Sequence, residues 1–307
     1  MMRLSEIAMA TQGQLIGADV EVCCVGTDSR AIQAGQLFVA LQGEHFDGHD
    51  YLAQSLAQGA SAVLVAKAGE QHPAVLVKDT RLALGTLAAH WRAKFQMPVV
   101  AITGSNGKTT VKEMLAAILR VAAGDDNGVL ATKGNLNNDI GLPMTMLNLG
   151  KQHRYAVLEM GMNHKGEISY LSKIAKPDIA VITNIAEAHI EFFRSKKGIA
   201  KAKSEIFEGL KKDGTAIINR DDEFYTLMKN AAQTKNIISF GLNKKSDIYL
   251  KKTTQGISQI HTPKGSIDIK VKLQGEHNLK NVLAAVASTI ALKIPLKTIK
   301  KGIEAIK

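Results

Sequence analysis

The pattern of apolar and polar positions divides this chain of 307 residues into two α/β segments. In residues 1–96, short apolar runs alternate with turns and predict strands at 22–25, 37–41, 62–66 and 74–77. Residues 51–58 and 80–95 are predicted as helices, the second from its helical apolar spacing. Gln96-Met97-Pro98 is a turn sequence that we interpret as a hinge. We therefore expect a small N-terminal α/β domain over residues 1–96.

Regular alternation of strands and helices begins at residue 97. Apolar runs predict strands at 99–103, 155–160, 179–185, 215–219 and 236–240, with a helix over 108–123 after the first. Because these runs are apolar on both faces, they indicate a mostly parallel sheet flanked by helices. Residues 247–250, 257–261 and 267–273 alternate and predict an antiparallel addition at one edge, followed by helices at 277–292 and 295–306. The fold class is therefore α/β, with a central domain over 97–307.

Length and composition agree with two ordinary globular domains, since 45% of the residues are hydrophobic and 22% are charged. The longest apolar stretch, residues 282–292, is shorter than the roughly 20 residues of a membrane helix. The N-terminus also lacks the apolar core of a signal peptide, so we expect no membrane insertion and a cytoplasmic location. Cys23 and Cys24 are adjacent, which suits neither a structural disulfide nor a metal site. We interpret them as small hydrophobic residues of the strand at 22–25.

The net charge of +11 is concentrated in the second half of the chain. Residues 1–150 carry 11 basic and 13 acidic side chains, whereas residues 151–307 carry 28 basic and 15 acidic ones. The lysines occur as scattered pairs with few aromatic residues among them, so there is no stacking surface of the kind that binds single-stranded nucleic acid. We expect a solvated lysine-rich face or polyanionic small substrates, and no nucleic-acid partner.

A glycine-rich segment connects the strand at 99–103 to the helix at 108–123, and its sequence is Gly104-Ser105-Asn106-Gly107-Lys108-Thr109-Thr110. Glycines let backbone N–H groups approach phosphate oxygens, the helix N-terminus adds a positive end, and the lysine adds a point charge. The Thr109 hydroxyl can bind Mg²⁺. Ile102 stands where the strict phosphate-loop motif has its first glycine. We therefore interpret the segment as a shortened relative of that loop.

Two further polar residues follow predicted strands of the same sheet. Glu159 ends the strand at 155–160, and His189 follows the strand at 179–185. Chemistry in a parallel sheet takes place outside the carboxyl ends of the strands, so both side chains are expected near Thr109. Together they would form a Mg²⁺ pocket beside a γ-phosphate. Taken singly, the glutamate is more typical of a surface position and the histidine of a core or capping one.

These motifs resemble the Mur ligases, the ATP-dependent amino-acid and peptide ligases of peptidoglycan precursor synthesis. The phosphate loop with its preceding Thr103 is similar to the form that the family carries, including the missing first glycine. Residues 134–143 (GNLNNDIGLP) and 159–168 (EMGMNHKGEI) are similar to the branch that adds D-alanyl-D-alanine to UDP-N-acetylmuramoyl-tripeptide. The resemblance covers essentially the whole chain.

The resemblance implies roles for residues of the central domain. Lys108 and the backbone of residues 104–110 would bind the phosphates of ATP. Two Mg²⁺ ions would be held by four residues, namely Thr109, Glu159, His189 and Lys203. Lys203 matches the lysine that this family carbamylates, which turns a cation into a carboxylate-like anion. The segment Gly275-Glu276-His277-Asn278-Leu279-Lys280-Asn281 would contact the nucleotide through His277, Asn278 and Asn281, although Asn278 could equally cap a helix.

The resemblance also implies a site for the UDP-linked substrate. Ser29 and Arg30 would face the uridine and the pyrophosphate. The loop at 43–49 would accompany them through Asp47, Gly48 and His49, and the asparagine-rich loop would contribute Asn135, Asn137 and Asn138. His45 and His49 suggest a metal site at first sight, but the two glycines and the lack of a third ligand favour a substrate-contact loop.

The implied reaction is acyl activation by ATP, in which an acyl phosphate forms and the amine of D-alanyl-D-alanine then displaces phosphate. The third residue of the tripeptide can be lysine or diaminopimelate, and we expect a monomer. Family members carry a further C-terminal domain that closes over ATP, and the sequence ends before it, so we expect these 307 residues to ligate poorly or not at all. Three alternatives stay open: a sister ligase that adds a diamino acid, a phosphate-loop kinase or nucleotide switch, and a non-catalytic UDP-sugar-binding fragment.

Overall fold

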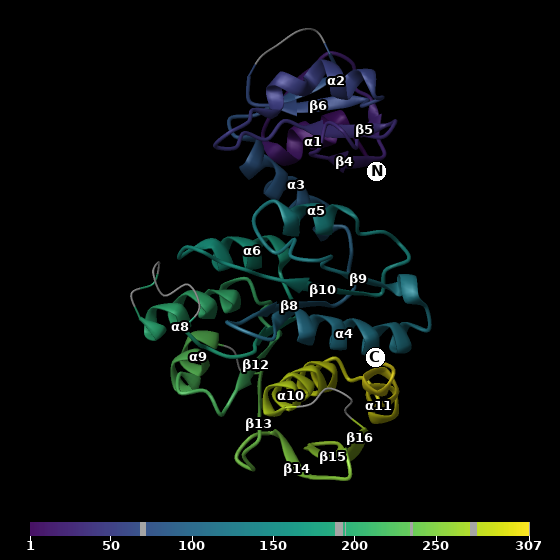
Figure 1. Cartoon of the computed structure of the whole chain (residues 1–307). Helices are drawn as coiled ribbons and strands as arrows, with labels where there is room; N and C mark the ends of the chain where they lie inside the picture. Colours follow the sequence, from purple (N-terminus) through teal and green to yellow (C-terminus); the bar gives the residue numbers. More distant parts are fainter. Residues whose placement is uncertain (68–71, 188–192, 194, 234–235, 271–274, 307) are drawn as a thin grey trace. The chain divides into compact units, whose positions relative to one another are not determined.

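The computed structural model describes residues 1–67, 72–187, 193, 195–233, 236–270 and 275–306. These residues form two compact units. Figure 1 shows the elements of both units, coloured by their position in the sequence. Unit 1 consists of Met1–Phe95 and Asp139–Leu149, and unit 2 consists of Gln96–Asn138 and Gly150–Lys307. Among the described residues, no helix is both long enough and apolar enough to cross a lipid bilayer.

Unit 1 is built on a five-stranded sheet. Its strands, in spatial order, are β2 (Gln14–Ile16), β7 (Ala74–Leu76), β6 (Ala62–Val65), β5 (Gln36–Val39) and β4 (Cys24–Gly26). Strands β4 to β7 are parallel and β2 is antiparallel. A separate antiparallel ribbon joins β1 (Met2–Arg3) to β3 (Glu21–Val22). The helical elements are α1 (Leu4–Thr11), η1 (Gly48–Tyr51), α2 (Leu52–Ala57), α3 (Thr80–Ala93) and α5 (Gly141–Leu147).

Unit 2 is built on a nine-stranded sheet. In spatial order it contains β16 (Gly265–Lys270), β15 (Ile257–Thr262), β14 (Ile248–Thr254), β13 (Asn236–Gly241), β12 (Thr215–Asn219), β11 (Ile179–Ile182), β8 (Val99–Thr103), β10 (Tyr155–Glu159) and β9 (Val129–Ala131). Strands β8 to β14 are parallel, and β15 and β16 are antiparallel to their neighbours. The carboxyl ends of β8, β10, β11 and β12 therefore lie at one edge of the sheet, where ligands bind in open α/β sheets.

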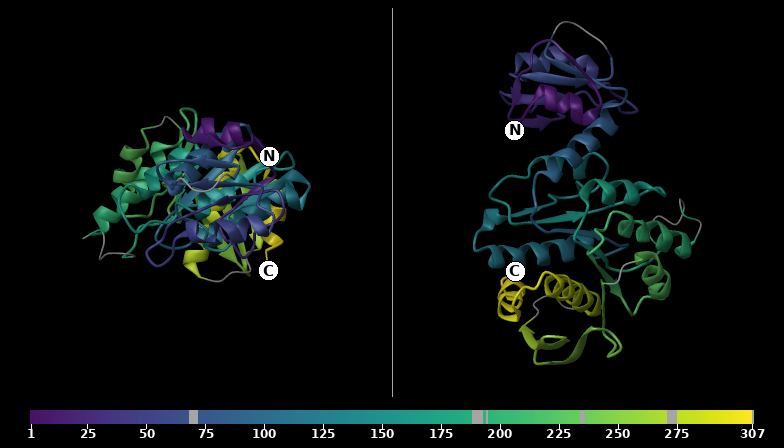
Figure 2. Two further views of the ribbon diagram at one scale, coloured as in Figure 1. Left: turned by 90° about the horizontal axis from the view of Figure 1, so that it is seen from above. Right: turned by 180° about the vertical axis from the view of Figure 1, so that it is seen from behind.

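Helices cover both faces of this sheet (Figure 2). The face that contacts α4 (Lys108–Ala123) also carries α10 (Glu276–Ala291) and α11 (Leu296–Glu304). A second group of helices contacts η3 (Glu205–Glu208) and consists of α6 (Glu167–Ala175), α8 (Lys196–Ser204) and α9 (Tyr225–Ala232). The short η2 (Asp126–Gly128) follows α4.

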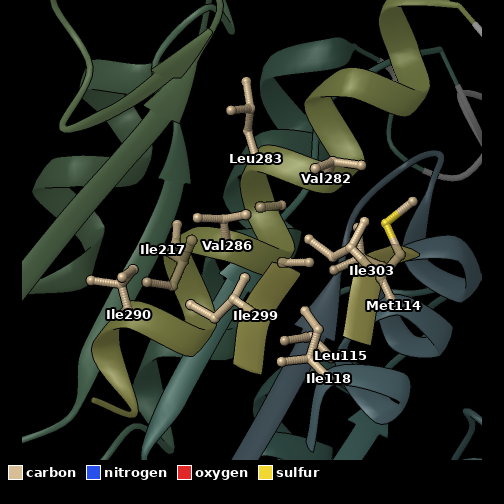
Figure 3. Close-up of a cluster of buried hydrophobic side chains, with 14 of the residues drawn as sticks. Met114, Leu115, Ile118, Ile217, Val282, Leu283, Val286, Ile290, Ile299 and Ile303 are labelled. Carbon is tan, nitrogen blue, oxygen red and sulfur yellow. The ribbon is translucent and has the colours of Figure 1, made fainter. Parts of the chain in front are cut away.

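The main hydrophobic core lies between the sheet and α4, α10 and α11. Figure 3 shows side chains that meet there, among them Met114, Leu115, Ile118, Ile217, Val286 and Ile303. A Cβ atom at Gly302 of α11 would lie only 2.4 Å from the Cα atom of Ile118. The glycine thus lets α11 approach the backbone of α4 directly. This packing fixes α4, whose first residues follow the phosphate loop.

The α/β class, the mostly parallel sheet and the antiparallel addition at its edge are confirmed, while two local predictions are wrong. Residues 22–25 form parts of two strands in different sheets, because the backbone bends at Cys23. The strand predicted at 179–185 ends at Ile182. The predicted helix at 51–58 is confirmed as α2, and its first predicted residue, Tyr51, belongs to the preceding η1 turn. Strand β14 pairs parallel to β13 and antiparallel to β15, so β14, β15 and β16 form the predicted antiparallel addition. Residues 271–273 of the last predicted strand lie outside the described residues.

Candidate functional site

The phosphate loop spans the turn between β8 and α4 and depends on two glycines. Gly104 has a φ of +153° and Gly107 a φ of +80°, which are backbone conformations that L-residues rarely adopt. A Cβ at Gly104 would lie 1.8 Å from Thr183 Oγ1, and one at Gly107 would lie 2.3 Å from Asn281 Oδ1. Only glycine therefore lets the loop lie this close to the end of β11 and to α10.

The loop is fixed from one side by the residues after β11. The backbone N–H groups of Ser105 and Asn106 donate to Asn184, at 2.9 Å and 3.0 Å. Thr183 Oγ1 donates to the Asn106 carbonyl at 2.6 Å. These two N–H groups are thus already engaged, although the sequence predicted the whole of 104–110 as a phosphate cradle. The first turn of α4 has no intrahelical acceptors for its N–H groups, and these point toward any anion at the helix N-terminus.

Lys108 lies at this helix terminus with its amine folded back over the loop. Its Nζ donates to the Gly104 carbonyl at 2.9 Å. Burial lowers the pKa of Lys108, and the nearby Glu159 carboxylate partly opposes that shift. The amine and carboxylate therefore belong to one electrostatic environment, as predicted from the strand order.

Glu159 ends β10 and is only 2% exposed. Its Oε2 accepts a hydrogen bond from Thr109 Oγ1 at 2.9 Å, and its Oε1 accepts one from Asn137 Nδ2 at 2.9 Å. The structure thus brings together two of the predicted Mg²⁺ ligands, Thr109 and Glu159. Asn137, predicted as a substrate contact, orients this carboxylate. His189 lies outside the described residues.

Lys203 lies in the last turn of α8 and is 2% exposed. Burial, with a smaller contribution from the charge of Lys108, lowers the pKa of Lys203 to about 7. No hydrogen bond joins the Lys203 amine to another residue that the structure describes. Within the described part of the chain, no group of three His, Cys, Asp or Glu side chains is placed to hold a metal. A metal ion here would therefore need ligands other than Glu159. The predicted ones are the Thr109 hydroxyl, a modified Lys203 and His189, which lies outside the described residues.

A cavity of about 610 Å³ adjoins the phosphate loop at the ends of β11 and β12. It is lined by residues of those strand ends and of the first turns of α10, including Thr183, Asn219, Asp222, His277 and Asn281. Two of the three predicted nucleotide contacts thus line it, whereas Asn278 does not. Gly275, rather than Asn278, is the residue at the N-cap of α10.

Asp222, which the sequence analysis did not identify, also lines this cavity. Its carboxylate accepts hydrogen bonds from the backbone N–H groups of Ile185 and Phe224, at 2.7 Å and 2.9 Å. Burial raises the pKa of Asp222 above its usual range. The carboxylate therefore fixes the segment after β11 against the segment after β12, on the cavity wall.

The predicted substrate residues of unit 1 form two groups. Arg30 is exposed and makes a bidentate ion pair with Asp28 at 2.9 Å, which lowers the pKa of Asp28 to about 2, and Ser29 lies between them. In the other group, His49 Nδ1 lies 2.5 Å from Asp47 Oδ1, and His49 Nε2 accepts from the Ala66 N–H at 2.9 Å.

The second group therefore fastens its own loop. Asp47 also binds Lys67 at 2.5 Å, and Lys67 and His49 hold the pKa of Asp47 well below its usual range. Gly48 is buried, and its N–H donates to the Leu41 carbonyl at 2.8 Å. Both ring nitrogens of His49 are used within unit 1, which agrees with a shaped loop and leaves the histidine no free nitrogen for a metal. Asn135 and Asn138, the remaining predicted contacts, are exposed in unit 2.

Comparison with protein-family models assigns most of the chain. Residues 102–289 match the Mur ligase middle domain, and residues 21–92 match the catalytic domain of the Mur ligase family. This chain belongs to the Mur ligase family. The matched ranges include the phosphate loop, Glu159 and Lys203 in one case and Ser29 and Arg30 in the other.

Individual Mur ligases are similar over nearly the whole chain. The UDP-N-acetylmuramoyl-tripeptide–D-alanyl-D-alanine ligase of Haemophilus influenzae is 44% identical, over 99% of this chain and 68% of its own length. The ligase of the same name from Bacillus subtilis is 40% identical, over 99% of this chain and 67% of its own length. MurF of Acinetobacter baumannii has a similar structure, with a TM-score of 0.93, 40% identity and coverage of 99% of this chain and 68% of its own. MurF of Thermotoga maritima, solved in complex with ADP, has a TM-score of 0.81 and 30% identity, with coverage of 92% of this chain and 66% of its own.

Two buried residues support the Mur ligase site without having been predicted. Lys112 of α4 is 1% exposed, and its Nζ donates to the Thr132 carbonyl at 2.8 Å. Thr132 Oγ1 in turn accepts from the Glu159 N–H at 2.9 Å. These contacts connect the phosphate-loop helix to the backbone of Glu159 through Thr132, which follows β9. In the sequence, the burial of Lys112 was indicated by its position on the apolar stripe of the predicted helix, together with Ala116 and Leu119.

Proposed function

We propose that this chain binds ATP and UDP-N-acetylmuramoyl-tripeptide and acts in the ligation of D-alanyl-D-alanine to that tripeptide. The observation that carries the proposal is the contact between Thr109 and Glu159 directly behind the phosphate loop. Relatives that are 40–44% identical over 99% of the chain bear the name of this activity. We also propose that it works as a monomer in the cytoplasm, where UDP-linked precursors and ATP are available.

ATP would bind with its phosphates at the N-terminus of α4. The N–H groups of the first turn and the Lys108 amine supply positive charge there. The cavity of about 610 Å³ beside the loop has room for the rest of the nucleotide, with His277 and Asn281 on its wall. The ADP complex of the Thermotoga maritima relative supports nucleotide binding by this fold.

The oxygen atoms of Glu159 and Thr109 fit a Mg²⁺ ion, which prefers hard oxygen ligands. The Glu159 carboxylate is buried, and its hydrogen bonds come from neutral groups, so it has charge available for a cation. When bound, Mg²⁺ would neutralise phosphate charge and orient the γ-phosphoryl group. We propose His189 and a carbamylated Lys203 as the further ligands of two such ions.

Carbamylation of Lys203 is supported by the chemistry of its amine. Only a neutral amine attacks carbon dioxide, forming an N–C bond and releasing a proton, and the pKa of about 7 keeps much of this amine neutral near pH 7. The product is an anion with two oxygen atoms. It would replace the repulsion between Lys203 and Lys108 by attraction.

The reaction follows from this arrangement. The terminal carboxylate of the tripeptide attacks the γ-phosphorus of ATP, the bond to the β-phosphate oxygen breaks, and an acyl phosphate and ADP form. The amine of D-alanyl-D-alanine then attacks the acyl carbon, and phosphate leaves as the amide forms. Lys108 and the N–H groups of α4 stabilise the negative charge of the transferring phosphoryl group. In unit 1, Arg30 presents a guanidinium oriented by Asp28, a group suited to a pyrophosphate, with Ser29 beside it.

Calorimetric titration with ADP and Mg²⁺ tests the nucleotide site. We expect Glu159→Gln to weaken the Mg²⁺-dependent part of the affinity at least about tenfold, or about 1.4 kcal/mol. Glu44→Gln, at an exposed position of unit 1, is the matched control and should bind like the wild type. Equal Mg²⁺ dependence in the two variants would contradict the metal role of Glu159.

Phosphate release tests the reaction. With ATP, Mg²⁺ and UDP-N-acetylmuramoyl-tripeptide present, D-alanyl-D-alanine should stimulate release and diaminopimelate should not. Stimulation by the diamino acid instead would identify a sister ligase. Release that is indifferent to the UDP-linked substrate would identify a kinase or nucleotide switch.

A further inference from the structure

Two neighbouring thiols of unit 1 lie on the same side of the backbone. In a continuous strand, adjacent side chains point to opposite faces, which would separate the sulfur atoms of Cys23 and Cys24. Here Cys23 lies in a bend between β3 and β4, and Cys24 is the first residue of β4. The two Sγ atoms are 3.2 Å apart. The interpretation of both cysteines as hydrophobic strand residues is therefore wrong for Cys23, which is exposed, and Cys24 is half-buried.

The backbone that carries the pair is anchored on both sides. The Cys23 N–H donates to the Gly35 carbonyl at 2.8 Å, and its Sγ lies 3.6 Å from the Ala34 carbonyl oxygen. Cys24 is paired with Gln36 in the parallel ladder of β4 and β5. The closeness of the thiols is thus built into the folded unit, and one of the two is open to solvent.

We propose that Cys23 and Cys24 form one chelating site for trivalent arsenic, as inorganic arsenite or as an aryl arsenical. Sulfur atoms 3.2 Å apart, each about 2.3 Å from a shared central atom as in metal–thiolate bonds, subtend an angle of roughly 90°. That angle suits a pyramidal trivalent centre better than tetrahedral zinc. Zinc would also need further ligands, and no group of three His, Cys, Asp or Glu is placed for this among the residues described.

The bond changes balance without any oxidant. An aryl arsenic oxide and two thiols give a cyclic dithioarsenite and one water: two S–H bonds and the arsenic–oxygen bond break, and two As–S bonds and two O–H bonds form. Arsenic remains trivalent throughout. The contact with Cys24, together with burial, raises the pKa of the Cys23 thiol. Reagents that need a free thiolate should therefore react slowly with this pair, whereas the arsenical takes up both thiols with loss of water.

The test uses the whole chain, which contains only these two cysteines, so no other thiol competes. The reduced protein is mixed with one equivalent of phenylarsine oxide and analysed by intact-mass spectrometry after dialysis against a monothiol. We expect one arsenical per chain, retained against 2-mercaptoethanol and released by 2,3-dimercaptopropanol.

Cys23→Ser and Cys24→Ser each keep one thiol and should retain the arsenical at least about 100-fold more weakly, because chelation supplies the second bond at high effective concentration. Circular dichroism and thermal melting show whether each variant is folded. Retention by either folded variant at the wild-type level would overturn the proposal, as would two arsenicals per wild-type chain. Reduced, folded wild-type protein that retains no arsenical after dialysis would overturn it as well. None of these measurements depends on the proposed ligase activity.

Discussion

Lys203 should react with carbon dioxide at neutral pH far more readily than an ordinary lysine. Its pKa of about 7, compared with the usual 10.5, makes about half of the amine neutral at pH 7. For an unperturbed lysine the neutral fraction would be roughly 0.03%, so the reactive form is enriched on the order of a thousandfold. The cause is structural, since the side chain is 2% exposed and the charge of Lys108 acts on it.

Carbon-13 NMR with labelled bicarbonate measures this reactivity. The wild-type chain should give one slowly exchanging carbamate signal at neutral pH. Lys203→Met should lose the signal, and Lys201→Met, which changes an exposed lysine of the same helix, should keep it. Absence of the signal in the folded wild type at saturating bicarbonate, or its persistence in Lys203→Met, would refute the reasoning.

The same pKa also predicts how stability depends on pH in buffer free of carbon dioxide. Between about pH 7 and pH 10, Lys203 is protonated in the unfolded chain but largely neutral in the folded one, so the unfolded state binds more protons. The free energy of unfolding should therefore rise with pH across this window and lose that contribution below it. The maximum effect is about 5 kcal/mol, from about 3.5 pKa units at about 1.36 kcal/mol each. Chemical denaturation should show that Lys203→Met removes this part of the rise while Lys201→Met does not.

Three further substitutions test the packing and the site. Gly302→Ala should lower the free energy of unfolding by about 1–3 kcal/mol in denaturant titrations, because the new Cβ would meet the backbone of Ile118. Alanine favours helices, so a stabilised variant would contradict this contact. Gly107→Ala should weaken ADP binding in calorimetry at least tenfold. Its Cβ would meet Asn281, and a φ of +80° is strained for alanine. Unchanged affinity would mean that the loop adapts. Lys112→Met should stay folded in thermal melts but bind Mg²⁺–ADP several-fold more weakly, because it loses a link between α4 and the strand that carries Glu159. Unaltered binding would make Lys112 a purely structural residue.

The parts of the fold that were predictable have strong local signals. The strand at 99–103 and the helix at 108–123 have the predicted bounds, because a fully apolar run, a glycine turn and a helical apolar stripe follow one another. The short first helix, α1, was missed, since its eight residues contain few polar positions to mark a period. The bend at Cys23 was missed because an apolar run does not show where hydrogen bonding passes from one sheet to another.

Predictability of the site divides along the same line. The phosphate loop is contiguous, so a phosphate-binding role could be predicted from its residues and the flanking strand and helix, and parallel strand order correctly placed Glu159 beside Thr109. The contacts of that carboxylate with Asn137 and of Lys112 with Thr132 join residues that are about twenty positions apart. Such contacts depend on how loops return to the sheet edge, and a single sequence carries no periodic signal for them.

The charges around the phosphate loop suggest an order of events in the proposed reaction. Lys203 is buried and Lys108 is half-buried, the charge of Lys108 acts on Lys203, and Glu159 is the carboxylate that acts on Lys108. Burial is the main reason why the Lys203 amine is partly neutral, and the charge of Lys108 lowers its pKa further. A bound nucleotide would bring several negative charges to the same place, stabilise the protonated amine and so slow its reaction with carbon dioxide. Carbamylation should therefore precede nucleotide binding, because the negative charge of ATP would oppose the part of the Lys203 pKa shift that comes from Lys108.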